Sequence, residues 1–166
     1  TAFNGSTVPG VDNALVSTAP PATDLPSTLA FVRQHAPDTI GGASVNFNQT
    51  FNSTVSAQTA FPAGGGDSGL LPGFDLEMWG LPTSGPMIDP NNHNFIFQRF
   101  QRGVMHYDAS CSCTQGLLLA DYLRAIITGQ NLPADVAGEA QNSPLYQQYD
   151  KNAPHWVHDP NRLPNT

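Results

Sequence analysis

The chain has 166 residues, of which 15 are glycine and 15 are proline, and only 11% are charged. A chain of this length forms one domain with a core, and its Gly and Pro content predicts many turns and irregular segments. The formal net charge of −7 argues against nucleic-acid binding, because neutralising phosphates requires clustered Lys and Arg. No apolar run reaches the ~18 residues of a membrane helix, so we expect no membrane insertion. Ser, Thr, Asn and Gln replace charged residues, which favours a secreted or cell-surface protein.

Residues 1–25 are predicted to form an extended arm or linker, because Pro and Gly interrupt a stretch rich in Thr, Ser and Ala. The first predicted helix covers 27–36, with Asp24 or Ser27 as its N-cap. Apolar and polar residues then alternate over 43–61, which predicts a strand or hairpin with one solvated face.

The central part of the chain carries two further strand patterns. Alternation over 74–78 predicts a strand with the carboxylates of Asp75 and Glu77 on one face. A longer aromatic-rich alternation over 95–107 is interrupted by Gly103, which predicts a two-stranded ribbon bent at that glycine.

The last third of the chain predicts helices and a tail. Apolar residues over 117–127 have helical spacing, with Thr114 as a cap and Gly129 at the end. A second helix is predicted over 133–141. The Pro-rich residues 151–166 are predicted to form an extended C-terminal tail.

Together these elements predict an α+β fold. We expect a single globular domain over 26–150, built from a small irregular antiparallel sheet that is packed by one main helix near 115–128. Extended Pro- and Gly-rich arms flank this domain.

The two cysteines, Cys111 and Cys113, are separated by one residue, and their spacing leaves three states open. A disulfide would lock a local turn, although it closes a very small ring and such rings are usually strained. Two free thiols are the second state. A soft-metal site is the third, with His106 and Asp108 as the nearby ligand types, although zinc sites normally show a second ligand pair.

Four residues are candidates for binding a saccharide, because such sites combine aromatic faces with a few hydrogen-bonding side chains. The aromatic candidates are Trp79, Tyr107 and Trp156, and Gln98 supplies an amide. The alternative for Trp79 is a core anchor beside a turn, and for Trp156 it is a packing residue of the tail.

Acid–base hydrolysis is the second chemistry that the sequence allows. Residues 67–89 contain Asp75, Glu77 and two further carboxylates but no Lys or Arg, so repulsion could raise one pKa and leave an acid opposite a base. His106 and Asp108, two residues apart on one strand face, could orient or shuttle a proton. The alternative is a set of solvated carboxylates on an acidic surface. No cofactor and no metal site are predicted.

The blocks GLPTS at 80–84 and FQRFQRGVMHY at 97–107 resemble the LGFP-type repeat of bacterial cell-wall proteins. The segment TQGLLLADYL at 114–123 is loosely similar to the closing part of that repeat, and the combination also looks like C-terminal modules of secreted Chloroflexota-type proteins. The resemblance implies a secreted, envelope-associated module that binds wall glycan.

The function we expect is therefore a secreted, non-catalytic cell-envelope or glycan-binding module, with a cell-wall glycan or other polysaccharide as its partner. One alternative is a small secreted glycan hydrolase that uses a carboxylate pair. The other is a structural surface protein that self-assembles or docks on a neighbouring chain.

Overall fold

The structure is a computed structural model that describes residues 2–3, 6–132, 137–149, 152 and 158–159. The chain divides into two compact units, Thr1–Leu118 and Leu119–Thr166, and each is described by itself. The boundary between them falls inside the predicted domain 26–150.

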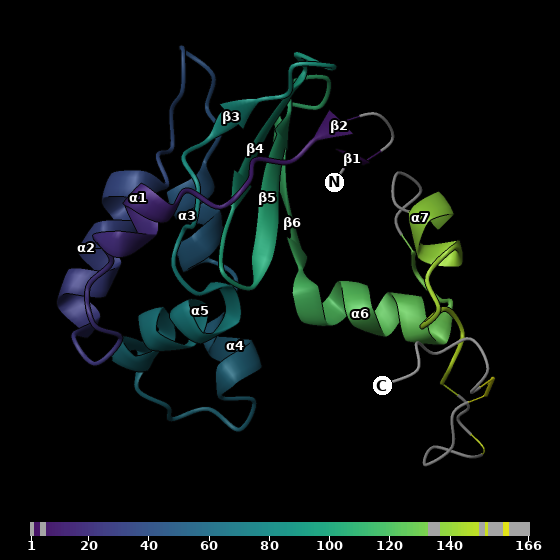
Figure 1. Ribbon diagram of the computed structural model, residues 1–166. Helices are drawn as coiled ribbons and strands as arrows, with labels where there is room; N and C mark the ends of the chain where they lie inside the picture. Colours follow the sequence, from purple (N-terminus) through teal and green to yellow (C-terminus); the bar gives the residue numbers. More distant parts are fainter. Residues whose placement is uncertain (1, 4–5, 133–136, 150–151, 153–157, 160–166) are drawn as a thin grey trace. The chain divides into compact units, whose positions relative to one another are not determined.

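A four-stranded antiparallel sheet is the centre of the first unit (Figure 1). The strands are β3 (Met87–Ile88), β4 (Phe95–Arg99), β5 (Gly103–Asp108) and β6 (Cys113–Leu118), and each pairs with the next in the chain. A separate pair joins β1 (Ala2–Phe3) to β2 (Ser6–Thr7). The predicted α+β class with an antiparallel sheet is confirmed.

Gly103 has a different role from the predicted one. The chain reverses direction between β4 and β5, and the backbone N–H of Phe100 donates to the carbonyl of Gly103 at 2.8 Å. The two strands predicted on either side of Gly103 are confirmed as a tight antiparallel hairpin, in which the glycine begins the second strand and does not bend the ribbon.

Helices precede the sheet in the first unit. They are α1 (Asn13–Ser17), α2 (Leu25–His35), α3 (Phe47–Asn52), α4 (Ala57–Ala60), a 3-10 turn η1 (Ser68–Leu70) and α5 (Leu71–Trp79). The helix predicted at 27–36 is confirmed as α2, and its N-cap is Asp24, whose carboxylate accepts from the backbone N–H of Ser27 at 3.2 Å.

The strands predicted over 43–61 and 74–78 are wrong, because both segments form helices. The buried residues of one helix face give a pattern that resembles strand alternation. In 43–61 the chain forms α3 and α4, and Phe47 and Phe51 are both fully buried at the helical spacing of four residues. In 74–78 the chain forms part of α5, which buries Asp75 and Trp79, again four residues apart.

The core of the first unit lies between three helices and one face of the sheet. α2, α3 and α5 supply the helical side chains. The segment 115–128, predicted as the one main helix that packs the sheet, instead contains the end of strand β6 and, from Leu119, a helix of the second unit. The buried members are Phe31, Val32, Ala36, Val45, Phe47, Phe51, Trp79, Leu81, Ile96, Phe100, Met105 and Tyr107.

The second unit contains α6 (Leu119–Thr128) and α7 (Ala137–Gln141). The prediction that Thr114 caps a helix is wrong, because residues 113–118 pair with β5 and the helix begins at Leu119. The predicted end of the helix at Gly129 is confirmed, where φ is +67°. The second helix, predicted over 133–141, is observed as α7; residues 133–136 lie outside the described part. None of the described helices is long and apolar enough to cross a membrane.

Candidate functional site

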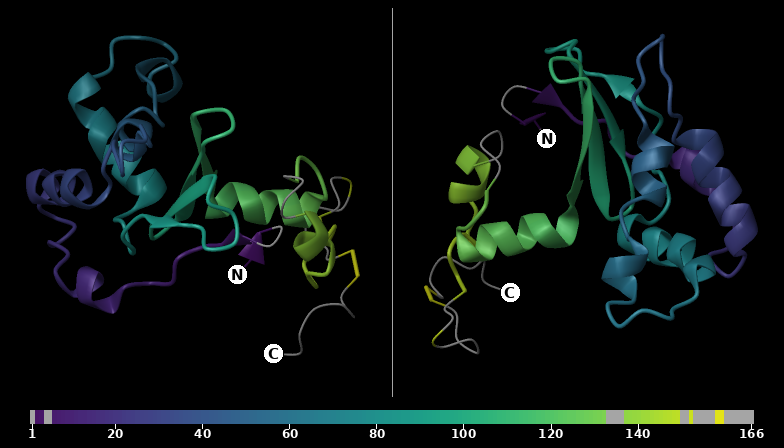
Figure 2. Two further views of the ribbon diagram at one scale, coloured as in Figure 1. Left: turned by 90° about the horizontal axis from the view of Figure 1, so that it is seen from above. Right: turned by 180° about the vertical axis from the view of Figure 1, so that it is seen from behind.

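One face of the sheet packs against the helices and is called the inner face, and the opposite one is called the outer face. Successive side chains of a strand point alternately to the two faces. Gln98 lies opposite Met105 and Tyr107 lies opposite Ile96, and all four are buried on the inner face, toward the helices. The outer face carries Phe95, Phe97, His106, Asp108 and Gln115, because these residues alternate with the inner ones on β4, β5 and β6. The helices and the sheet can be compared from two sides in Figure 2.

Three rings form a cluster on the outer face. The ring centroids of Phe95 and Phe97 are 5.9 Å apart, and each phenyl centroid lies 5.7 Å from the imidazole of His106. Phe97 is buried, whereas Phe95 and His106 are half-buried, so the cluster offers part of its surface to solvent. Such partly exposed rings suit contact with the apolar face of a sugar.

Polar groups extend the cluster on two sides. Gln115 is exposed and lies directly opposite His106 in the strand register. Beyond Phe95, the β3–β4 loop at 90–94 is exposed and contains three asparagines. This loop lies beside the β5–β6 turn, because the backbone N–H of Ala109 donates to the carbonyl of Asn94 at 2.8 Å. Amide and carboxylate groups therefore surround one end of the aromatic cluster.

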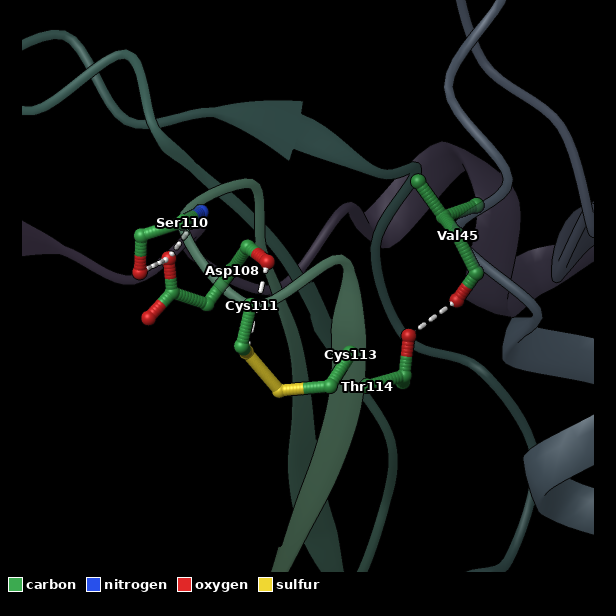
Figure 3. The surroundings of a disulfide bond; sticks show 6 residues. All are labelled: Val45, Asp108, Ser110, Cys111, Cys113 and Thr114. Carbon is green, nitrogen blue, oxygen red and sulfur yellow. Dashed lines mark hydrogen bonds between the residues drawn. A yellow bond between two sulfur atoms is a disulfide. The ribbon is translucent and has the colours of Figure 1, made fainter.

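Asp108 is held as a carboxylate at this end (Figure 3). Its Oδ1 accepts from the hydroxyl of Ser110 at 2.6 Å and from the backbone N–H of the same residue at 2.8 Å. These hydrogen bonds lower the pKa of Asp108, and the nearby His106 adds a smaller effect in the same direction. The predicted pairing of His106 and Asp108 on one strand face is confirmed by the register.

The adjacent turn contains a disulfide between Cys111 and Cys113. Of the three states that the sequence left open, the structure shows the disulfide (Figure 3). No group of three or more His, Cys, Asp or Glu side chains that could hold a metal occurs within the described part of the chain.

The residues predicted to bind a saccharide do not belong to this cluster on the outer face. Trp79 is 2% exposed, and its indole N–H donates to the hydroxyl of Thr54 at 2.7 Å, which is the core-anchor alternative. Gln98 is fully buried, and Tyr107 is buried on the inner face. These three side chains therefore present no open surface to a ligand. Trp156 lies outside the described residues.

The two carboxylates predicted to share a strand face are separated by the helix that carries them. Asp75 is fully buried, and its Oδ1 accepts from the backbone N–H of Val55 at 2.7 Å. Burial raises the pKa of Asp75. Glu77 is exposed and forms an ion pair with Arg102, with 3.2 Å between the nitrogen and oxygen. The prediction of a shared face is wrong, because side chains two residues apart on a helix point in different directions.

No family model matches the chain. Neither a curated protein nor a solved structure matches it.

An open cleft of about 390 Å³ lies in the Leu119–Thr166 unit. Its described lining residues are Arg124, Ile127, Thr128, Gln130 and Tyr149. The backbone N–H of Tyr149 donates to the carbonyl of Ile127 at 2.9 Å, which holds the aromatic residue beside α6. Arg124 is the only charged residue among these five described lining residues.

Proposed function

We propose that this chain is a secreted, non-catalytic module that binds cell-wall or other glycan through the outer face of its sheet. The observation that carries the proposal is the partly exposed cluster of Phe95, Phe97 and His106, bordered by Asp108 and Gln115. Sugar rings stack their C–H faces on such rings, while amides donate to and accept from hydroxyl groups and carboxylates accept hydrogen bonds from them.

Secretion is supported by the disulfide, since such bonds form and persist mainly in oxidising compartments. The low content of charged residues and the resemblance of segments 80–84 and 97–107 to the LGFP-type repeat support the same assignment.

The states of the carboxyl groups favour binding over catalysis. Glycoside hydrolysis needs a protonated carboxyl group and a second carboxylate on either side of the scissile bond. Asp108 has a lowered pKa, so it is a poor proton donor near neutral pH. Asp75 has a raised pKa, but it is fully buried and bonded to the backbone. These two groups therefore make a poor acid–base pair.

Cosedimentation with purified bacterial cell wall and with insoluble polysaccharides tests this function. We expect protein in the pellet without released sugar, and we expect Phe95→Ala and Gln115→Ala to reduce the bound fraction. Phe74→Ala is the matched control, because Phe74 is an exposed aromatic residue on α5. Circular dichroism checks that each variant is folded. Release of sugar would support the hydrolase alternative, and equal binding by all folded variants would contradict the proposed surface.

Self-association is the second candidate function, and an apolar stripe that runs from the end of η1 along α5 favours it. Leu70, Phe74 and Met78 are spaced four residues apart and are 52%, 38% and 42% exposed. Aligned exposed apolar side chains often mark an interaction surface. Sedimentation velocity over a range of concentrations should then show association that Phe74→Ser weakens and that Val11→Ser, at a 53% exposed site, leaves unchanged. A monomer at every concentration would reject this candidate.

A further inference from the structure

The Cys111–Cys113 disulfide lies at the surface, in the turn that joins β5 to β6 (Figure 3). Cys111 is exposed and Cys113 is half-buried. An attacking thiolate must reach a sulfur atom, so accessibility decides which disulfides exchange readily. This bond is accessible from the side of Cys111.

The bond contributes little as a structural cross-link. It joins residues only two positions apart, and the entropy that a disulfide removes from the unfolded chain increases with the length of the loop it closes. Ser112, the residue between the two cysteines, has a φ of +51°. This value lies in the left-handed region that non-glycine residues rarely adopt. Opening the bond frees this residue to leave that conformation.

The turn has anchors that do not depend on the disulfide. On the β5 side, the carboxylate of Asp108 accepts two hydrogen bonds from Ser110. On the β6 side, the hydroxyl of Thr114 donates to the carbonyl of the fully buried Val45 at 2.5 Å. The register between β5 and β6 continues from Asp108 to Gly103. We therefore expect reduction to leave the strands paired and to open only the turn.

We propose that this disulfide is a thiol-exchange site that reacts with a low-molecular-weight thiol in the folded protein. The thiolate attacks Sγ of Cys111 and forms a new S–S bond with it, while the Cys111–Cys113 bond breaks and Cys113 leaves as a thiolate that takes up a proton. A second thiolate attacks the external sulfur of the mixed disulfide, releases Cys111 as a thiolate, and yields the oxidised thiol. The two steps transfer two electrons from two thiols to the disulfide, and the reverse sequence restores the bond.

Glutathione is the probe that tests the proposal. The folded protein is equilibrated in buffers with a range of ratios of reduced to oxidised glutathione, quenched with acid, and analysed by peptide mass spectrometry. We expect the reduced fraction to rise with the ratio while the near-ultraviolet circular dichroism stays unchanged. We expect the mixed disulfide on Cys111 to exceed that on Cys113 by at least tenfold, because Cys111 is the more exposed residue.

Two variants separate exchange from a structural role. Cys113→Ser should accumulate a stable glutathione adduct on Cys111, whereas Cys111→Ser should react more slowly at its half-buried cysteine. The double variant should fold and unfold at nearly the wild-type urea midpoint. Reduction that occurs only in denaturant, a loss of the folded spectrum on reduction, or an adduct mainly on Cys113 would each overturn the proposal. None of these results depends on glycan binding.

Discussion

Gly116 on β6 lies directly beneath the indole ring of Trp79: a Cβ atom at position 116 would be 2.3 Å from Cη2 of the tryptophan. Gly103 makes room for the same ring from β5, where an added Cβ would be 2.7 Å from Cζ3. The indole N–H donates to Thr54 on the other side. Two glycines on neighbouring strands thus provide the space in which α5 contacts the sheet.

Gly116→Ala should therefore destabilise the protein. The added methyl group must displace either the ring or the strand, and overpacking of this kind costs about 1–3 kcal/mol. Urea denaturation followed by tryptophan fluorescence measures the change in the free energy of unfolding. Gly85→Ala is the control, because a Cβ there meets nothing within 4 Å and its φ is not in the left-handed region. Equal unfolding midpoints for the two variants would show that the strand or the ring of Trp79 can move to accommodate the methyl group without loss of stability.

The fold was predictable where local signals and packing agreed. Asp24 and the apolar spacing after it located α2, and the alternation over 95–107 located β4 and β5. Short helices were mistaken for strands because α3 and α5 span only 6 and 9 residues. Over that length, periods of 2 and 3.6 residues give similar apolar patterns. Phe47 and Phe51 share a face under either period, whereas the exposed Gln49 between them would share that face only in a strand. The exposure of Gln49 therefore decides for the helix, and it depends on the tertiary structure.

Asp75 should give the stability of the protein a distinctive pH dependence. Its pKa is raised in the folded state above the ordinary value of 3.8, so the native state binds this proton more tightly than the unfolded state does. The stability that this group contributes rises as the pH falls through its folded pKa and approaches 3.8. Asp75→Asn cannot titrate, so the stability of the wild type relative to this variant should increase with acidification.

The measurement is the free energy of unfolding of both proteins between neutral pH and pH 4. Asp67→Asn is a matched control, because it removes one negative charge from an exposed cap whose carboxylate accepts from the backbone N–H of Gly69. Parallel pH curves for the wild type and Asp75→Asn would contradict the raised pKa.

Ser110→Ala should raise the pKa of Asp108 toward its ordinary value. The hydroxyl of Ser110 is the main cause of the lowered pKa, and the backbone N–H of the same residue keeps part of the effect. A lowered pKa stabilises the fold above 3.8, and this stabilisation is lost as the pH falls from 3.8 through the folded pKa. In the variant the stabilisation is smaller, and its loss is complete at a higher pH. Carbon-13 NMR titration of the carboxyl group measures the shift. Ser112→Ala is the control, and an equal shift in both variants would rule out the Ser110 hydroxyl as the cause.

The candidate site was predictable only in part. His106 and Asp108 share a face because strand alternation alone requires it. The sequence gives no sign of which face of the strand meets the helices, so it cannot show that the aromatic side chain of Tyr107 lies on the inner face and not on a binding surface. Phe95 and Gln115 could have been found by taking the residues in register with His106 and Asp108. That register depends on β6, which was predicted to be part of a helix.

Thr114→Val should destabilise the first unit by about 1–3 kcal/mol, because it removes the hydroxyl that donates to the buried carbonyl of Val45. The change conserves volume, so the loss reflects the hydrogen bond and the desolvated carbonyl more than packing. Thr114→Ser is the matched control, since it retains the hydroxyl and should stay closer to the wild type in urea denaturation. The same ranking is expected after reduction of the disulfide, because this anchor lies on the β6 side of the turn and does not require the bond. If Thr114→Val were as stable as Thr114→Ser, the contact with Val45 would not anchor β6, and the turn would lose its main support when the disulfide opens.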